Sequence, residues 1–186
     1  INDYVLKMRE DKLSYQEAVK KILQENNIKS LPIPVIDIAK SFGFNIYSVN
    51  FKDDRVAGIM ADSDTPLKAF ENNKRIIAIN AKDYLERKYF TIAHEIGHFV
   101  LHCNKEQNFF ERYMHGLDRN QREDVENAAN AFAAELLMPA QMFIDFIKNN
   151  SGLTRNELIE EIRRTFIVSP KAIERRLDEL KINILG

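Results

Sequence analysis

The spacing of apolar residues in the first part of the chain predicts two helices. After Ser14-x-x-Glu17, a pattern typical of a capping box, apolar residues recur at helical intervals to about residue 26. A shorter helix is expected over residues 35–42, and Gly43 follows it where a glycine often ends a helix. This pattern indicates that the chain begins with helical rather than extended structure.

The period then changes from that of a helix to that of a strand. The runs over residues 44–49, 56–61 and 75–80 are rich in alternating or β-branched apolar side chains, as is typical of strands. The polar run 62–73 is expected to join the last two of them. A small three-stranded sheet is therefore predicted within a chain that is otherwise helical.

Helical periodicity returns after the sheet and continues to the end of the sequence. One helix is expected to start between Asp83 and Arg87, and its nearly continuous apolar surface predicts that it is buried. Further helices are expected over residues 122–138, 142–147, 154–166 and from 169 onward. Thr154-x-x-Glu157 is a second capping box, and Ser169 is the expected cap of the last helix. The predicted fold class is α+β and mainly helical. Residues 1–150 are expected to form one domain, and residues 151–186 a helical segment packed on it.

The helix predicted to be buried carries His94-Glu95-x-x-His98, the pattern of a zinc peptidase. Residues four apart lie on one face of a helix, so the two imidazoles can bind one cation. Zinc lowers the pKa of a water molecule in its open position, and Glu95 can accept the proton as that water attacks a peptide carbonyl. The same spacing arises by chance in roughly one chain of this size in two hundred, so a third ligand is needed to support the metal site.

A catalytic zinc site takes three protein ligands and leaves one position open. His102 lies on nearly the same helix face as His94. Eight residues nevertheless separate the two by roughly 12 Å along the helix axis, which is too far for one ion. We therefore expect His102 to be a packed or hydrogen-bonded core histidine.

A carboxylate on the helix over residues 122–138 is a better candidate for the third ligand. Glu126 is favoured, and Glu123 and Glu135 are its competitors on the same helix. Asn130 lies one turn from Glu126, and from there it can hydrogen-bond a metal-binding histidine from behind. Small alanines on this helix allow it to approach the first helix closely.

The polar segment over residues 104–121 carries several aromatic side chains. A connection of this length in a compact domain is often functional, so a lid or pocket wall beside the metal is one interpretation. The other is a surface excursion whose aromatic rings pack on the core. If the segment borders the cleft, His115 and Tyr113 are candidates to stabilise the oxyanion of a tetrahedral intermediate.

Two stretches of the sequence resemble the ImmA/IrrE family of zinc metallopeptidases. They are Phe90-Thr91-x-Ala93-His94-Glu95-x-Gly97-His98-x-x-Leu101-His102 and Glu126-x-x-Ala129-Asn130-x-Phe132-Ala133-Ala134-Glu135-Leu136-Leu137-Met138-Pro139. The resemblance is specific over about residues 75–139, and it implies a thermolysin-like, zincin-type core in which His94, His98 and Glu126 bind Zn²⁺. Glu95 is then the general base. The implied substrates are helix-turn-helix transcriptional repressors, cleaved to switch on a mobile element or a stress response.

Composition limits the other possible functions. Of the 186 residues, 45% are hydrophobic and 30% are charged, as expected of a soluble globular protein. The net charge of -1 gives no overall attraction to nucleic acid or to an anionic membrane. No apolar run reaches membrane-spanning length, and the single cysteine, Cys103, cannot form an internal disulfide, so a cytoplasmic location is expected.

The last two predicted helices resemble a helix-turn-helix. For DNA binding the second of them offers Lys171, Arg175 and Arg176. Residues 154–181 carry seven basic and six acidic side chains, however, which is a weak electrostatic footprint for an element that must neutralise phosphates. A structural or protein-docking role is therefore favoured over DNA binding.

The residues and the resemblance together predict a zinc-dependent endopeptidase whose partner is a protein substrate, a helix-turn-helix repressor. The alternative is a zinc-containing anti-repressor, or a DNA- or protein-binding module, that acts by capture with little proteolysis. The presence of Glu95 favours the enzyme, because a structural zinc site needs neither a base nor an open position.

Overall fold

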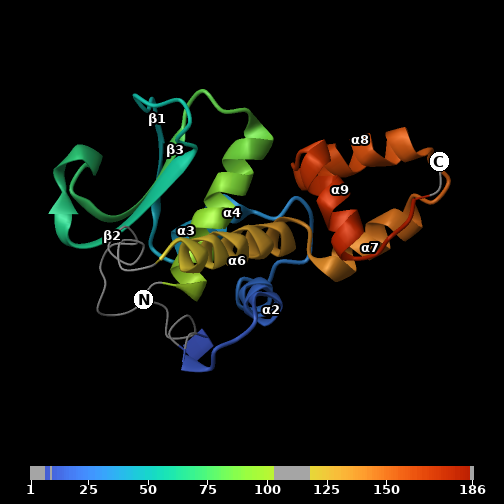
Figure 1. The fold of residues 1–186 in the computed structure, drawn as a ribbon, viewed down its shortest axis with the longest axis horizontal. Helices are drawn as coiled ribbons and strands as arrows, with labels where there is room; N and C mark the ends of the chain where they lie inside the picture. The colour runs from blue at the N-terminus through green and yellow to red at the C-terminus, as the bar shows by residue number, and fades with distance from the viewer. Residues whose placement is uncertain (1–6, 9, 103–117, 185–186) are drawn as a thin grey trace.

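The computed structural model describes residues 7, 8, 10–102 and 118–184, and these residues form an α+β fold (Figure 1). In chain order the elements are α2 (Tyr15–Glu25), α3 (Val35–Ser41), β1 (Asn45–Val49), β2 (Gly58–Leu67), the 3-10 helix η1 (Lys68–Phe70), β3 (Asn73–Asn80), α4 (Leu85–Leu101), α6 (Arg119–Leu137), α7 (Ala140–Asn149), α8 (Arg155–Phe166) and α9 (Pro170–Glu179). The sheet lies on one side of α4 and α6, and α7, α8 and α9 lie on the other side (Figure 1). None of the described helices has both the length and the apolar character that a bilayer-spanning segment needs.

Four of the described helices begin where a side chain caps the first amide groups. The predicted caps of α2, α8 and α9 are confirmed, with Ser14, Thr154 and Ser169 each accepting a backbone N–H of the first turn. The helix α6 starts earlier than residue 122, because Asp118 and Gln121 form a further capping box. This cap adds nearly a turn to the helix that carries Glu126.

The three predicted strands form one sheet with the order β1-β3-β2, in which β1 runs parallel and β2 antiparallel to β3. Alternate side chains of β3 enter different clusters. Ile77 and Ile79 pack in the main core, whereas Ile76 and Ala78 form a small cluster on the opposite face. The central strand is therefore buried on both faces and gives α4 a rigid support.

The strand β2 extends beyond its predicted end at Ala61, into part of the polar run that was expected to be a connector. Its pairing with β3 continues to Asp62, shifts register, and resumes at Leu67. The side chains of Asp62 and Arg75 form a cross-strand ion pair with a 3.0 Å contact. The apolar pattern of the sequence does not predict this part of β2, because its cross-strand contact is made by polar side chains.

The helices α4 and α6 approach each other closely at Gly97. A Cβ atom added there would lie 3.0 Å from Cδ1 of Phe132 and 3.2 Å from the carbonyl oxygen of Ala129. Contacts this short show that a larger side chain would push the two helices apart. Glycine on α4 and alanine on α6 thus bring the two helices close enough for side chains from both to meet at one point.

The helices α7, α8 and α9 pack against the rest of the molecule through both apolar and polar side chains. Phe143, Ile162 and Leu177 belong to the same hydrophobic cluster as the core of α4 and α6. On α8, the guanidinium of Arg163 forms a 2.8 Å ion pair with Glu86 at the start of α4. The division of the chain at residue 150 stays a prediction.

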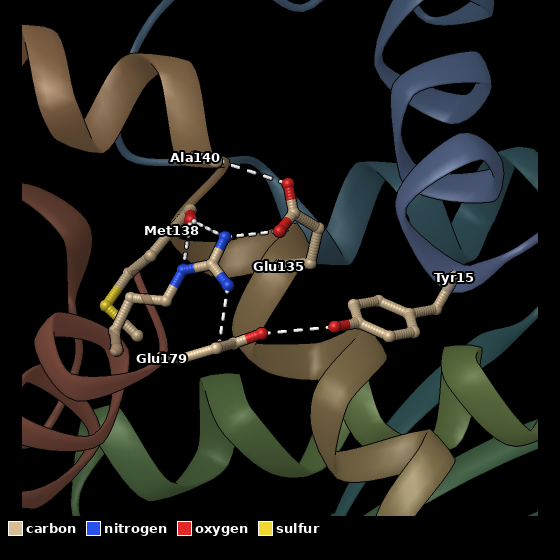
Figure 2. A network of polar contacts seen from close by, with 6 residues as sticks. Tyr15, Glu135, Met138, Ala140 and Glu179 are labelled. Atoms are coloured by element: carbon tan, nitrogen blue, oxygen red, sulfur yellow. Dashed lines mark hydrogen bonds and ion pairs between the residues drawn. The ribbon is translucent and has the colours of Figure 1, made fainter. Parts of the chain in front are cut away.

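A buried polar network ties α9 to the end of α6 (Figure 2). The side chain of Arg176 is only 1% exposed, and it donates hydrogen bonds to the carboxylate of Glu135 and to the carbonyl oxygen of Met138. It also forms a 2.8 Å ion pair with Glu179, whose carboxylate accepts a hydrogen bond from the hydroxyl of Tyr15 on α2. Arg176, a candidate DNA contact in the sequence, is therefore an internal residue of the fold.

Candidate metal centre

The helix α4 starts at Leu85, within the predicted interval, and holds the three residues of the motif in its second half. The side chain of His98 is 2% exposed and that of His94 is 17% exposed. One imidazole thus lies inside the protein, while the other reaches its surface. Within the part of the chain that the structure describes, the site is therefore accessible from the side of His94.

Three side chains from two helices meet at this site. The Nε2 atoms of His94 and His98 lie 2.9 Å apart, with their rings perpendicular. From α6, Glu126 places one carboxylate oxygen 3.3 Å from each of these Nε2 atoms. Among the described residues, this is the group of histidine, cysteine and acidic side chains whose donor atoms converge as a metal site requires.

The spacing of the donor atoms fits a divalent metal ion. Bonds of about 2.1 Å in a tetrahedral arrangement place neighbouring ligand atoms roughly 3.4 Å apart. The observed separations, 2.9 Å between the imidazoles and 3.3 Å from each imidazole to the carboxylate, are close to that value. Two neutral imidazoles and one carboxylate are also a donor set typical of catalytic metal sites with an open position.

The side chain of Asn130 lies directly behind His94. Its Oδ1 atom is 3.0 Å from Nδ1 of His94, on the ring edge that faces away from the cluster. An oxygen acceptor at Nδ1 favours the tautomer in which Nδ1 carries the proton. The lone pair of Nε2 then points toward His98 and Glu126, where a cation would bind.

The protonation equilibria of the three residues are coupled. The hydrogen bonds with His94 and then His98 hold the pKa of the Glu126 carboxyl well below its usual range. Burial alone would lower the pKa of His94, but the hydrogen bond with Glu126 and the surrounding carboxylates outweigh it and raise the pKa. For His98, burial is the larger effect and lowers the pKa. These shifts favour an ionised carboxylate and at least one neutral imidazole, which are the forms that bind a metal.

Glu95 follows His94 on α4 and is almost completely buried, with 7% of its surface exposed. Burial raises the pKa of its carboxyl to about 7, while His94 opposes this rise and Glu126 adds to it. A carboxylate whose pKa lies near neutrality can both accept and release a proton at physiological pH. The pKa of Glu95 therefore depends on the charges of His94 and Glu126, two of the three proposed ligands.

The competitors for the third ligand lie elsewhere. Glu123 is exposed, and Glu135 is held by Arg176 at the other end of α6. His102 lies one turn beyond His98, with a distance of 5.8 Å between the two ring centroids, and burial lowers the pKa of its imidazole to about 4. The assignment of Glu126 as the third ligand stays a prediction, which this geometry favours.

Part of the predicted site lies outside the described residues. This part includes residues 104–117 of the expected lid and the two oxyanion candidates Tyr113 and His115. Phe90 was not among the residues predicted for the site. Its ring packs beside that of His94, with a distance of 6.3 Å between the two centroids. Its position four residues before His94, one helical turn away, could have indicated this contact.

Residues 39–178 match the model of a peptidase family, M78, described as the IrrE N-terminal-like domain. The match covers well over half of the chain. The chain therefore belongs to this family.

The chain is also similar to two individual proteins. The radiation response metalloprotease IrrE of Deinococcus deserti is 33% identical over 108 residues, which make up 56% of this chain and 37% of that relative. The match thus spans little more than a third of the relative's length. A solved structure of a Mycobacterium tuberculosis transcriptional regulator shares the fold, with a TM-score of 0.60 and 15% identity over 92% of this chain and 49% of that chain.

Proposed function

We propose that this protein is a zinc-dependent endopeptidase of the HExxH type that cleaves a helix-turn-helix transcriptional repressor. The observation that carries the proposal is the convergence of His94, His98 and Glu126, with the buried carboxyl of Glu95 beside them. Zinc is the metal proposed, because two imidazoles and one carboxylate are its ligands in catalytic peptidase sites.

When bound, zinc supplies Lewis-acid chemistry, polarising a peptide carbonyl and lowering the pKa of a water molecule. In this chain, Glu95 is the group that takes the proton of the attacking water and passes it to the leaving amine. The burial that raises its pKa to about 7 suits both transfers. Asn130 holds the ring of His94, and therefore its Nε2 atom, in the orientation needed for binding.

Two observations support a repressor as the substrate. The motifs on α4 and α6 resemble those of the ImmA/IrrE peptidases, whose implied substrates are helix-turn-helix repressors. The relative from Deinococcus deserti is named for a radiation response, and a stress response of this kind is a natural output of relieved repression. Substrate cleavage and gene induction are then two readouts of one reaction.

The substitution Glu95→Gln tests the catalytic role. It keeps the shape of the side chain and all three proposed ligands, but it removes the proton acceptor. We expect turnover to fall by about 10² to 10⁴, while metal content and melting temperature hardly change. The assay follows the mass of a helix-turn-helix repressor encoded beside the gene, with Glu123→Gln as a matched control on the exposed surface of α6.

The same variant distinguishes the peptidase from the alternative, an anti-repressor that acts by capture. Docking needs no proton acceptor at the metal, so a capture module would still induce its target genes as the Glu95→Gln protein. A peptidase would lose cleavage and induction together. Full derepression in cells by metal-loaded Glu95→Gln protein would therefore refute the peptidase as the source of function.

A further inference from the structure

A groove of about 520 Å³ lies between the first half of α4, the middle of α6 and the start of α9. This volume is within the range of roughly 300 to 1,000 Å³ that is usual for ligand pockets. Its lining includes Tyr84 and Phe90 from α4, Asn130 and Ala134 from α6, and Lys171 and Arg175 from α9. The C-terminal helices therefore form one wall of a concave surface on the peptidase.

The groove begins beside the metal centre. Asn130, which accepts the hydrogen bond from Nδ1 of His94, is part of its lining. Phe90, which also lines the groove, packs beside the ring of His94 at a centroid distance of 6.3 Å. The groove is thus lined by two side chains that contact His94, so a substrate bound in the groove lies next to the proposed metal site.

Most charges around the groove are neutralised by neighbours. Glu86 pairs with Arg163 at 2.8 Å, and Glu179 pairs with the buried Arg176 at the same distance. Arg87 pairs with Asp83 at 3.2 Å. The acidic residues of the lining are thus occupied by cations of the protein itself.

The cations on α9 differ from these residues. Lys171 and Arg175 are exposed, lie one turn apart on α9, and form no ion pair within the part of the chain that the structure describes. They give one wall of the groove a positive charge. The lining from α4 and α6 also includes the apolar side chains of Phe90, Ala131 and Ala134, and Tyr84, the residue before α4, is 59% exposed.

We infer that this groove binds an acidic segment of the protein substrate, in which carboxylates meet Lys171 and Arg175 and apolar side chains pack on Phe90 and the alanines of α6. The inference rests on the proposed function, because it names the substrate feature that the peptidase recognises. Complementary charge of this kind contributes specificity and association rate more than affinity. The C-terminal helices are then a specificity element of the peptidase.

The geometry favours a peptide over DNA as the occupant. A recognition helix must project from the protein to enter a major groove. The cations of α9 instead line a concavity that α4 and α6 close from the other side, and Arg176 is buried.

The experiment measures binding without turnover. Metal-loaded Glu95→Gln protein is titrated against a short fluorescein-labelled peptide of leucine and glutamate, and against its counterpart with glutamine in place of glutamate. The test variant adds Lys171→Glu and Arg175→Glu. The matched control adds Lys68→Glu and Lys74→Glu, two exposed residues of η1 and β3 on the opposite side of α4 from α9, with the same change in net charge (Figure 1).

We expect the glutamate peptide to bind more tightly than the glutamine peptide, and the α9 reversal to weaken its binding about tenfold, because two attractive pairs become repulsive. The control reversal should weaken it much less. Equal binding of both peptides, or equal loss in both variants, would overturn the inference. Binding of a labelled DNA duplex that only the α9 reversal abolishes would also overturn it, since the groove would then be a nucleic-acid surface.

These outcomes are separate from those of the proposed function. If a repressor is cleaved but the peptides bind without charge preference, the docking inference fails and the peptidase stands. If the glutamate peptide binds as expected but no repressor is cleaved, the groove recognises an acidic partner and the proposed function fails.

Discussion

The two ends of α6 use the same kind of side chain for opposite purposes. Near its start, Glu126 faces two imidazoles and its side chain remains 42% exposed. Near its end, Glu135 is 11% exposed and meets the guanidinium of Arg176, which always carries a positive charge. At Glu135 the protein supplies the cation itself, in the form of Arg176. At Glu126 it supplies only the donor atoms that a cation needs.

This difference explains what each end contributes. A buried carboxylate with a permanent counter-ion and further hydrogen bonds is a fixed joint, and removing either partner leaves an uncompensated charge. A carboxylate beside neutral imidazoles can exchange its partner, because its charge becomes fully balanced only when a metal binds. The first arrangement holds α9 to α6, and the second is a receptor for an ion. Substitutions at Glu126 and at Arg176 separate the binding of an ion from the attachment of α9.

The largest effect is expected from Glu126→Ala. Structural zinc sites bind their metal with about 10 to 16 kcal/mol, so the loss of one ligand costs roughly 3 to 4 kcal/mol, or about 10²- to 10³-fold in affinity. Competition with a metal-binding dye measures this change. The melting temperature of the metal-free protein should fall only slightly, because the side chain of Glu126 is 42% exposed and water screens its contacts with the two imidazoles.

Glu123→Ala is the matched control for this substitution, since it removes an exposed carboxylate from the same helix. It should leave the metal affinity unchanged. The opposite pattern, with Glu126→Ala unaffected and Glu123→Ala or Glu135→Ala without metal, would refute Glu126 as the third ligand. Glu135→Ala also tests whether the two ends of α6 are independent.

The substitution Arg176→Met breaks the joint at the other end. It leaves Glu135 buried without a counter-ion, and breaking a buried pair in this way typically costs about 3 to 5 kcal/mol. We expect about 3 kcal/mol, because Glu135 keeps the hydrogen bond that it accepts from the amide of Ala140. For a domain of this size the melting temperature should fall by roughly 6 to 12 °C. Metal affinity should not change.

The double variant Arg176→Met with Glu135→Leu is the companion measurement. Replacing both members of a buried pair with apolar side chains is often neutral, so most of the lost stability should return. A double variant as unstable as Arg176→Met alone would show that Glu135 is not the source of the cost. The bonds from Arg176 to the carbonyl oxygen of Met138 would then explain it.

The same two regions show how far the sequence predicts the structure. At the metal centre, the contacts within each helix could be predicted from helical spacing, whereas Glu126 was proposed from the usual donor set of a catalytic zinc site and stays a prediction. The motif at His94 and His98 follows from the geometry of one helix, and Asn130 follows from its position one turn after Glu126. The predicted starts of α2, α8 and α9 were accurate because capping uses side chains within three residues of the cap, whereas α6 and α7 start earlier than predicted.

The network around Arg176 could not be predicted, because its contacts connect distant parts of the chain. The partner of Arg176, Glu135, is 41 residues away, and nothing local to either residue indicates the pairing. Both residues were given other interpretations, as a DNA contact and as a possible metal ligand. The extension of β2 past Ala61 was missed for a related reason, since the ion pair between Asp62 and Arg75 leaves no apolar pattern.

The smallest effect is expected from Asn130, which acts on the metal only through His94. Loss of such a hydrogen bond behind a ligand typically weakens metal binding about 10- to 100-fold, and we expect the lower part of this range for Asn130→Ala because the residue is exposed. Asn130→Asp should restore the affinity, since a carboxylate oxygen accepts the same bond from Nδ1–H and makes the imidazole a stronger ligand.

Neither variant removes a ligand or touches the network around Arg176, so both should melt like the parent protein. Metal affinities from dye competition, together with melting curves of the metal-free proteins, measure these differences. If Asn130→Asp binds metal as weakly as Asn130→Ala, an oxygen acceptor at Nδ1 does not orient the histidine, and the role assigned to Asn130 is wrong.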